Sequence, residues 1–203
     1  MSVRIRLIYS KRGAACFVPH IALAQIFARS ASRAGFSLEL SQGFSPRPKL
    51  SFGPELPAGV VALHEPVDIY FAEEPVDVVD SLNLALPEGF RISDAVFISE
   101  GSPNLGKFCT HAEYFIRIAE CISDNSIDLA QYAQEFYGNA AIEIKYVDGW
   151  LRLVTKSPAQ FPIGGLVKYL ISSNIISGWH EINIVRNAVG IYHPQKGSVI
   201  LNA

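Results

Sequence analysis

The sequence predicts an α+β protein made of two tandem lobes with antiparallel sheets, and three observations support this class. The chain has 203 residues, 49% of them hydrophobic and 18% charged, which is enough for two modest cores. Segments with the two-residue period of strands alternate with segments of helical period. A stretch rich in Gly, Ser and Pro near residue 100 separates two halves of similar order. We therefore expect one lobe over residues 1–100 and a second over 108–203.

The first half is predicted to contain four strands and two helices. Val3–Tyr9 alternates apolar with mostly polar residues and is expected to be a half-buried strand. A helix is expected to begin at Pro19-His20 and to end before Gly35, which is placed as its C-terminal cap. The remaining strands are expected at 36–40, 67–72 and 91–99, and the second helix at 75–86. The resulting order, β-α-β-β-α-β, is that of ferredoxin-like folds.

The same order is expected to recur in the second half. Strands are predicted at 113–120, 141–147 and 150–155, a final strand or hairpin at 181–192, and helices at 127–137 and 162–173. Asp148-Gly149 is the strongest short turn signal in the chain, and it predicts a hairpin between the two middle strands. The prediction is therefore two ferredoxin-like lobes in tandem, with a linker over 99–107.

Residues 42–59 differ from the rest of the first half. Seven of these eighteen residues are Gly or Pro, so the segment is expected to be an extended loop stiffened by its prolines. Such a loop offers backbone N–H groups and the cations Arg47 and Lys49 with little ordering cost on binding.

Charge is unevenly distributed along the chain. Residues 1–50 hold eight Lys or Arg and one acid, Glu39, whereas the other 153 residues hold nine bases and eighteen acids. This segregation favours a positively charged face aimed at a polyanion such as RNA. The alternative is that the basic segment folds against acidic neighbours such as Glu73, Glu74 and Asp77.

The candidate nucleic-acid-binding residues follow from this pattern, and we expect the cations among them to converge into one positive surface. They are Lys11, Arg12, His20, Arg29, Arg33, Phe44, Arg47 and Lys49. Phe44 could stack on a base, unless the loop packs down and buries it. His20 could contact a phosphate at its helix start or bond only to its own backbone. Arg29 and Arg33 lie one turn apart and suit two successive phosphates or a merely solvated helix face.

Other site classes lack their required residues. Gly101 to Lys107 fits Gly-x-x-x-x-Gly-Lys, but a phosphate-binding loop needs Ser or Thr next and Phe108 follows. The glycines of Pro162-Ile163-Gly164-Gly165 could admit a phosphate or serve close packing. The histidines show no ligand spacing, no Gly-x-Ser-x-Gly elbow exists, and Cys16, Cys109 and Cys121 are expected to be buried and unpaired. We predict no catalytic centre and no cofactor in this chain.

Targeting signals are also missing from the sequence. No apolar leader and no apolar run long enough for a membrane span occur, so we expect a cytoplasmic protein without membrane association.

Residues 41–60 carry a family resemblance. The stretch Ser-Gln-Gly-Phe-Ser-Pro-Arg-Pro-Lys-Leu-Ser-Phe-Gly-Pro-Glu-Leu-Pro-Ala-Gly-Val resembles the signature of the radical-SAM-linked, DUF2344-like bacterial proteins. Ser10–Gly13, Phe17–Leu23 and Glu65–Asp68 resemble further parts of that family, so that residues 1–98 are covered well and the remainder loosely.

The resemblance implies a partner. Members of this family occur beside, or fused to, cobalamin-binding radical-SAM proteins, which implies a protein of that type as partner here. The family pattern has Asp where Ala22 stands, Asn where Ser45 stands and His where Arg47 stands. If the Asp and His of the family take part in chemistry, this chain lacks both, and the resemblance then implies a binding module. We expect a non-catalytic accessory that binds rRNA, tRNA or another ribosome-associated RNA for that partner. A protein–protein adaptor and a small RNA-processing or RNA-modifying enzyme are the alternatives.

Overall fold

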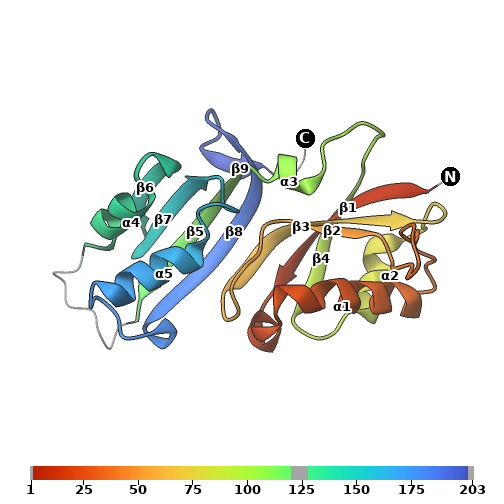
Figure 1. Cartoon of the computed structure of the whole chain (residues 1–203), viewed down its shortest axis with the longest axis horizontal. Helices are drawn as coiled ribbons and strands as arrows, with labels where there is room; N and C mark the ends of the chain where they lie inside the picture. Colours follow the sequence, from red (N-terminus) through yellow and green to blue (C-terminus); the bar gives the residue numbers. More distant parts are fainter. Residues whose placement is uncertain (1, 120–127, 201–203) are drawn as a thin grey trace.

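The computed structural model describes residues 2–119 and 128–200, which form a mixed α+β fold. Its centre is a nine-stranded, mostly antiparallel open sheet, with the path β4-β1-β3-β8-β5-β7-β6 and the short strands β2 and β9 paired to β3 and β8. Two helices lie against each half of this sheet (Figure 1). In the part of the chain that the structure describes, no helix is long and apolar enough to cross a membrane.

The first half runs from β1 to β4. Its elements are β1 (Val3–Lys11), a 3-10 turn (Gly13–Phe17), α1 (His20–Arg33), β2 (Leu50–Phe52), β3 (Val61–Phe71), α2 (Val78–Ala85) and β4 (Phe90–Phe97). The strand order is β4-β1-β3-β2, with antiparallel pairing throughout. Alternate residues of β1 point towards α1, so Ile5 and Leu7 share a buried cluster with Phe27.

The second half repeats this connectivity. After the short α3 (Leu105–Phe108) come β5 (His111–Ile118), α4 (Leu129–Tyr137) with a 3-10 turn (Gly138–Ala140), β6 (Ala141–Val147), β7 (Trp150–Lys156), α5 (Ile163–Ser172), a 3-10 turn (Trp179–Glu181), β8 (Ile182–His193) and β9 (Ser198–Ile200). The order β8-β5-β7-β6 matches that of the first half, strand for strand, and is also antiparallel.

The two halves share one sheet, because β3 and β8 pair in parallel. The paired residues are Val61 with Val185, Ala62 with Arg186, and His64 with Ala188. The larger hydrophobic cluster likewise spans both halves, since it holds Leu56 and Val60 together with Leu105 and Phe108. Sequence periodicity predicts the strands of each half, and it gives no sign of the parallel pairing that joins them.

The predicted elements are largely present, with one exchange in the first half. The segment 36–40 makes only isolated bridges, and the second strand is instead Leu50–Phe52, inside the Gly- and Pro-rich segment. These three residues are free of Gly and Pro, so their backbone N–H groups can pair with β3. β3 begins at Val61, six residues before the predicted start, and α2 is shorter than expected.

The second half follows its prediction closely. Asp148 and Gly149 have φ values of 48° and 76°, and they form the turn of the β6–β7 hairpin as predicted. α4 begins after Asp128, whose side chain accepts a hydrogen bond from the N–H of Ala130. Glu120 and Ile127, which belong to elements predicted from the sequence, and Cys121, which is predicted to be buried and unpaired, lie outside the described residues.

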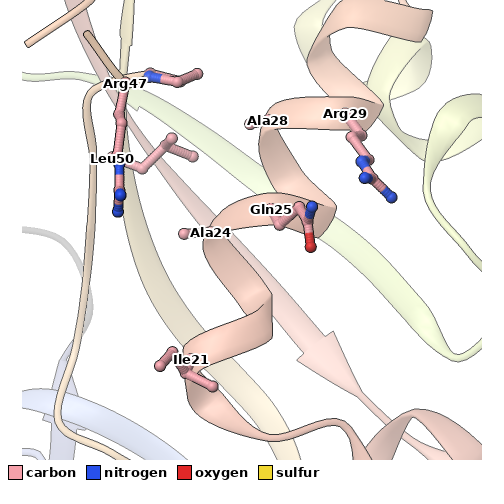
Figure 2. A pocket seen from close by; sticks show the side chains of 8 residues that line it. Ile21, Ala24, Gln25, Ala28, Arg29, Arg47 and Leu50 are labelled. Carbon is pink, nitrogen blue, oxygen red and sulfur yellow. The ribbon is translucent and has the colours of Figure 1, made fainter. Parts of the chain in front are cut away.

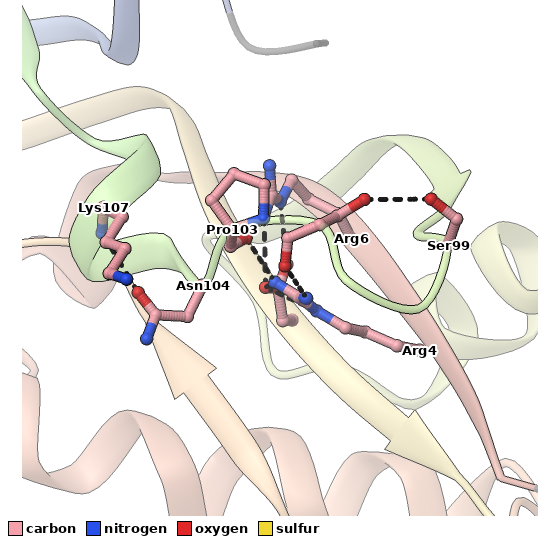
Figure 3. Close-up of polar contacts among 8 residues, drawn as sticks. Arg4, Arg6, Ser99, Pro103, Asn104 and Lys107 are labelled. Atoms are coloured by element: carbon pink, nitrogen blue, oxygen red, sulfur yellow. Dashed lines mark hydrogen bonds and ion pairs between the residues drawn. The ribbon is translucent and has the colours of Figure 1, made fainter.

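The linker between the halves is tied to β1 and β3. Asp68 is fully buried and accepts hydrogen bonds from Arg4 (Nη2–Oδ2, 2.5 Å) and Arg6 (Nε–Oδ1, 2.8 Å). Arg4 also donates to the carbonyl oxygens of Ser102 at 3.0 Å and Pro103 at 2.8 Å (Figure 3). The linker is therefore part of the folded structure, fixed by two guanidinium groups that share one carboxylate.

Candidate functional site

Residues 38–50 form a narrow hairpin-like projection from the sheet, called the arm below. Leu40 and Pro48 form a bridge, the N–H of Ser41 donates to the carbonyl of Arg47 at 2.8 Å, and the N–H of Lys49 donates to that of Glu39. Every residue from Leu40 to Lys49 is exposed, and Phe44 at the tip has no shielding at all. Phe44 is therefore free to contact a ligand, whereas Phe52 packs edge-on against Phe27 and Tyr9.

A hollow of about 390 Å³ lies between α1 and the arm, and it is called the α1 groove below. Its lining residues are Ile21, Ala24, Gln25, Ala28 and Arg29 from α1, and Arg47, Pro48 and Leu50 from the arm. Figure 2 shows Ile21, Ala24 and Ala28 on the side of the helix that faces Arg47 and Leu50, with Gln25 and Arg29 further round the helix. The groove thus has an apolar floor with one arginine from each wall.

Neither arginine of the α1 groove is neutralised. Across residues 2–119 and 128–200, no carboxylate forms an ion pair with Arg29 or Arg47, and both residues are exposed. The backbone of Arg47 is fixed, since its N–H donates to the Ser41 hydroxyl at 3.1 Å. The two guanidinium groups come from separate elements and point to different sides of the groove (Figure 2), so they can bind different phosphates of one chain.

Lys49 lies on the same arm but is engaged. Its Nζ is 3.0 Å from Glu39 Oε1 and 4.2 Å from the centre of the Tyr70 ring. The hydrogen bond from Lys49, followed by one from Ser2, lowers the pKa of Glu39. A polyanion would have to compete with Glu39 for this ammonium group.

Burial removes Lys11 from the predicted surface. Only 2% of the residue is exposed, and its Nζ donates to the carbonyl of Val18 at 3.3 Å. Loss of hydration lowers the pKa of Lys11, with opposing contributions from Cys16 and Glu65. His20 is half-buried at the first residue of α1, with its ring 5.9 Å from that of Phe52. Burial lowers the pKa of His20 most, and the Glu55 carboxylate opposes this shift.

Arg12 and Arg33 lie at other hollows. Arg12 borders one formed with Asn83, Gly89 and Arg91. Arg33 donates to the carbonyl of Ala85 and to the Ser30 hydroxyl, so it caps the last turn of α2.

The expectation of a single positive surface therefore needs correction. Arg29 and Arg47 both line the α1 groove, whereas Lys11 is buried and Arg12 and Arg33 border different hollows. The reason is that several of the early cations are bound by carboxylates of the same chain. Arg4 and Arg6 bind Asp68 and Lys49 binds Glu39, in place of the acidic neighbours Glu73, Glu74 and Asp77 that the sequence suggested.

A buried ion pair at the junction of the halves was not predicted from the sequence. Arg186 on β8 is 2% exposed and contacts Glu65 on β3 through Nε–Oε1 at 2.7 Å and Nη2–Oε2 at 2.5 Å. Its Nη2 also donates to the carbonyl of Pro54 at 2.9 Å. Near this pair, burial and the Glu65 carboxylate raise the pKa of Tyr9 above its usual range. The sequence signal that could have indicated this ion pair is an arginine at an inward-facing position of an otherwise apolar strand.

The remaining sequence candidates have structural roles. Lys107 lies in the four-residue α3, which Asn104 caps and which leads into β5, so the segment is not a phosphate-binding loop. At the start of α5, a side chain on Gly165 would collide with Phe136, which explains this glycine by close packing. Cys16 and Cys109 are free and buried. Among the described residues, no group of three His, Cys, Asp or Glu side chains could hold a metal ion.

Comparison with known protein families gives a match. A family profile described as "Uncharacterized protein conserved in bacteria (DUF2344)" matches residues 4–148, which include the arm, the α1 groove and the linker. No curated protein matches the chain.

Proposed function

Because the chain belongs to the DUF2344 family of bacterial proteins, we propose that it is a non-catalytic accessory protein that binds RNA at the α1 groove and the arm. The observation that carries the proposal is that Arg29 and Arg47, neither of which has a carboxylate partner among the described residues, line the same hollow from two elements. RNA phosphates are bound by such guanidinium groups, and an exposed aromatic such as Phe44 stacks on unpaired bases.

The wider setting belongs to the same proposal. The matching order of strands in both halves supports a pair of ferredoxin-like units, a class that includes many RNA-binding proteins. The partner would be a cobalamin-binding radical-SAM protein, to which this chain brings rRNA, tRNA or another ribosome-associated RNA. The complex would act in the cytoplasm, where free thiols such as Cys16 and Cys109 are stable.

The test compares two charge-reversed variants. In Arg29→Glu/Arg47→Glu, affinity for single-stranded RNA should fall, and the slope of log affinity against log salt should decrease by about 0.7 for each phosphate that is no longer neutralised. Lys168→Glu/Lys196→Glu changes the net charge equally at exposed positions of the second half and is the matched control. Unchanged affinity and slope in the first variant would refute RNA binding at this site.

An adaptor that docks on the radical-SAM protein is the second candidate. It is favoured by Phe17 and Ile21, which are 71% and 88% exposed around the start of α1. Its test is copurification of the two proteins after nuclease treatment, with Phe17→Ser/Ile21→Ser as the variant that should lose it. Recovery that depends on intact RNA would favour the first candidate.

A small RNA-processing or RNA-modifying enzyme is the third possibility from the sequence. No feature of the α1 groove favours it over binding, because its polar groups are two arginines and one glutamine. Conversion of labelled RNA by the purified chain alone would establish it.

A further inference from the structure

The floor of the α1 groove is built from small side chains. Ala24 and Ala28 are one turn apart on the helix, so they leave a flat strip along α1. Leu50 and Pro48 form the facing wall, and Ile21 closes one end. A strip of this kind lets a planar group lie against the helix without a side chain in its way.

The size of the groove limits what can occupy it. At about 390 Å³ it is at the lower end of the range for small-molecule pockets, about 300–1,000 Å³. An RNA double helix hides the faces of its bases by stacking and cannot place one in such a hollow. A single base that has left its stack can enter it.

Polar groups border this apolar strip on both sides. The Gln25 amide can donate and accept hydrogen bonds, which suits the edge of a base. Arg29 beside it and Arg47 across the groove are free to bind the phosphates on either side of a nucleotide. An apolar slot between two cations that form no ion pair with any described residue is complementary to a nucleotide, which has a flat apolar face and an anionic backbone.

Building on the RNA-binding proposal, we propose that the α1 groove is a slot for one unstacked base of single-stranded RNA. Ala24 and Ala28 form the surface on which the base lies, and Gln25 contacts its edge. Arg29 and Arg47 hold the adjoining phosphates, and Phe44 takes a neighbouring base at the tip of the arm. The chain therefore selects unpaired RNA and rejects duplex.

The test fills the slot without changing charge. Ala24→Leu places a large side chain on the floor at an exposed position, and Leu is nearly as good a helix former as Ala. The control, Ser32→Leu, adds the same side chain at an exposed position of α1 outside the groove. The probes are an oligouridylate of about 12 nucleotides, its duplex with oligoadenylate, and a ribose-phosphate oligomer of equal length that lacks bases.

The wild-type chain should bind the oligouridylate about tenfold or more tightly than the baseless oligomer or the duplex. Ala24→Leu should remove this preference and leave the salt dependence unchanged, while Ser32→Leu should stay within about twofold of wild type. Equal binding of all three probes, or an undiminished preference in Ala24→Leu, would overturn the base slot while RNA binding stands. Failure of the wild-type chain to bind any probe at low salt would overturn both proposals.

Discussion

Arg186 and Glu65 form a two-contact ion pair at the only place where the sheet has parallel pairing among the described strands. Arg186 lies opposite Ala62 in the β3–β8 register, and Glu65 follows three residues later on β3. The guanidinium also reaches the carbonyl of Pro54, just after β2. One buried side chain of the second half thus connects two segments of the first.

Replacing Arg186 should lower the free energy of unfolding, because this side chain connects the two halves. Arg186→Met leaves Glu65 buried without its partner, which costs about 3–5 kcal/mol of unfolding free energy. Arg186→Met/Glu65→Leu removes both charges and should regain a large part of this loss. Urea denaturation of the three proteins checks the prediction, and it would be contradicted by a double variant less stable than Arg186→Met.

Neutralising Asp68 should loosen the linker. In Asp68→Asn the guanidinium groups of Arg4 and Arg6 lose their shared carboxylate in a buried site, and the expected cost is about 3 kcal/mol or more. Limited proteolysis should then cut between residues 99 and 104 faster than in the wild-type chain. Asp148→Asn, at an exposed turn with positive φ that Asn tolerates, should change neither stability nor cleavage.

The contact between α4 and α5 should reject a methyl group at Gly165. A Cβ there would lie 2.6 Å from Phe136 Cζ. Overpacking costs about 1–3 kcal/mol, more than the gain of up to about 1 kcal/mol from replacing Gly by Ala in a helix. Gly165→Ala should therefore have a lower melting temperature than wild type. Gly106→Ala, where the nearest atom would be 3.5 Å away, should melt at the wild-type temperature or slightly above it.

The titration of His20 should depend on Glu55. Burial holds the pKa of His20 below its usual value of 6.5, while the Glu55 carboxylate raises it. Between the lowered pKa of His20 in the folded chain and its ordinary pKa in the unfolded chain, the unfolded chain holds more protons than the folded one. The free energy of unfolding therefore decreases as the pH falls through this window. Glu55→Gln should lower the pKa of His20 further, as measured by NMR titration of the imidazole protons. A pKa at or above 6.5 in the wild-type chain would contradict this account, and Glu88→Gln is the control.

Local signals predicted most of the elements. The turn at Asp148-Gly149 and the cap at Gly35, with φ of 81°, depend on neighbouring residues alone, and both stand in the structure as predicted. The exchange of the second strand from 36–40 to Leu50–Phe52 has a different origin. Only the partner strand β3 decides which of two nearby extended segments completes a ladder, and a single sequence does not show that partner.

The candidate site could be predicted only in part, because a single sequence does not show which segments pair in the folded chain. Arg29 and Arg47 are visible as cations in the sequence, but the fact that both line one hollow depends on the path of the arm. Lys11 has the same charge and ends up buried, because β1 continues two residues past Tyr9 and places it at an inward position. Sequence patterns indicate the kind of chemistry, and tertiary pairing decides which residues can perform it.

Two strands pair with the same edge of β3. Val61–His64 pairs with β8, and Val67–Ile69 pairs with β2. A fragment that stopped near residue 100 would leave Val61–His64 with unsatisfied backbone groups and Glu65 without its guanidinium. Such a fragment would self-associate through this open edge, so the arm and its groove have to be studied in the intact chain.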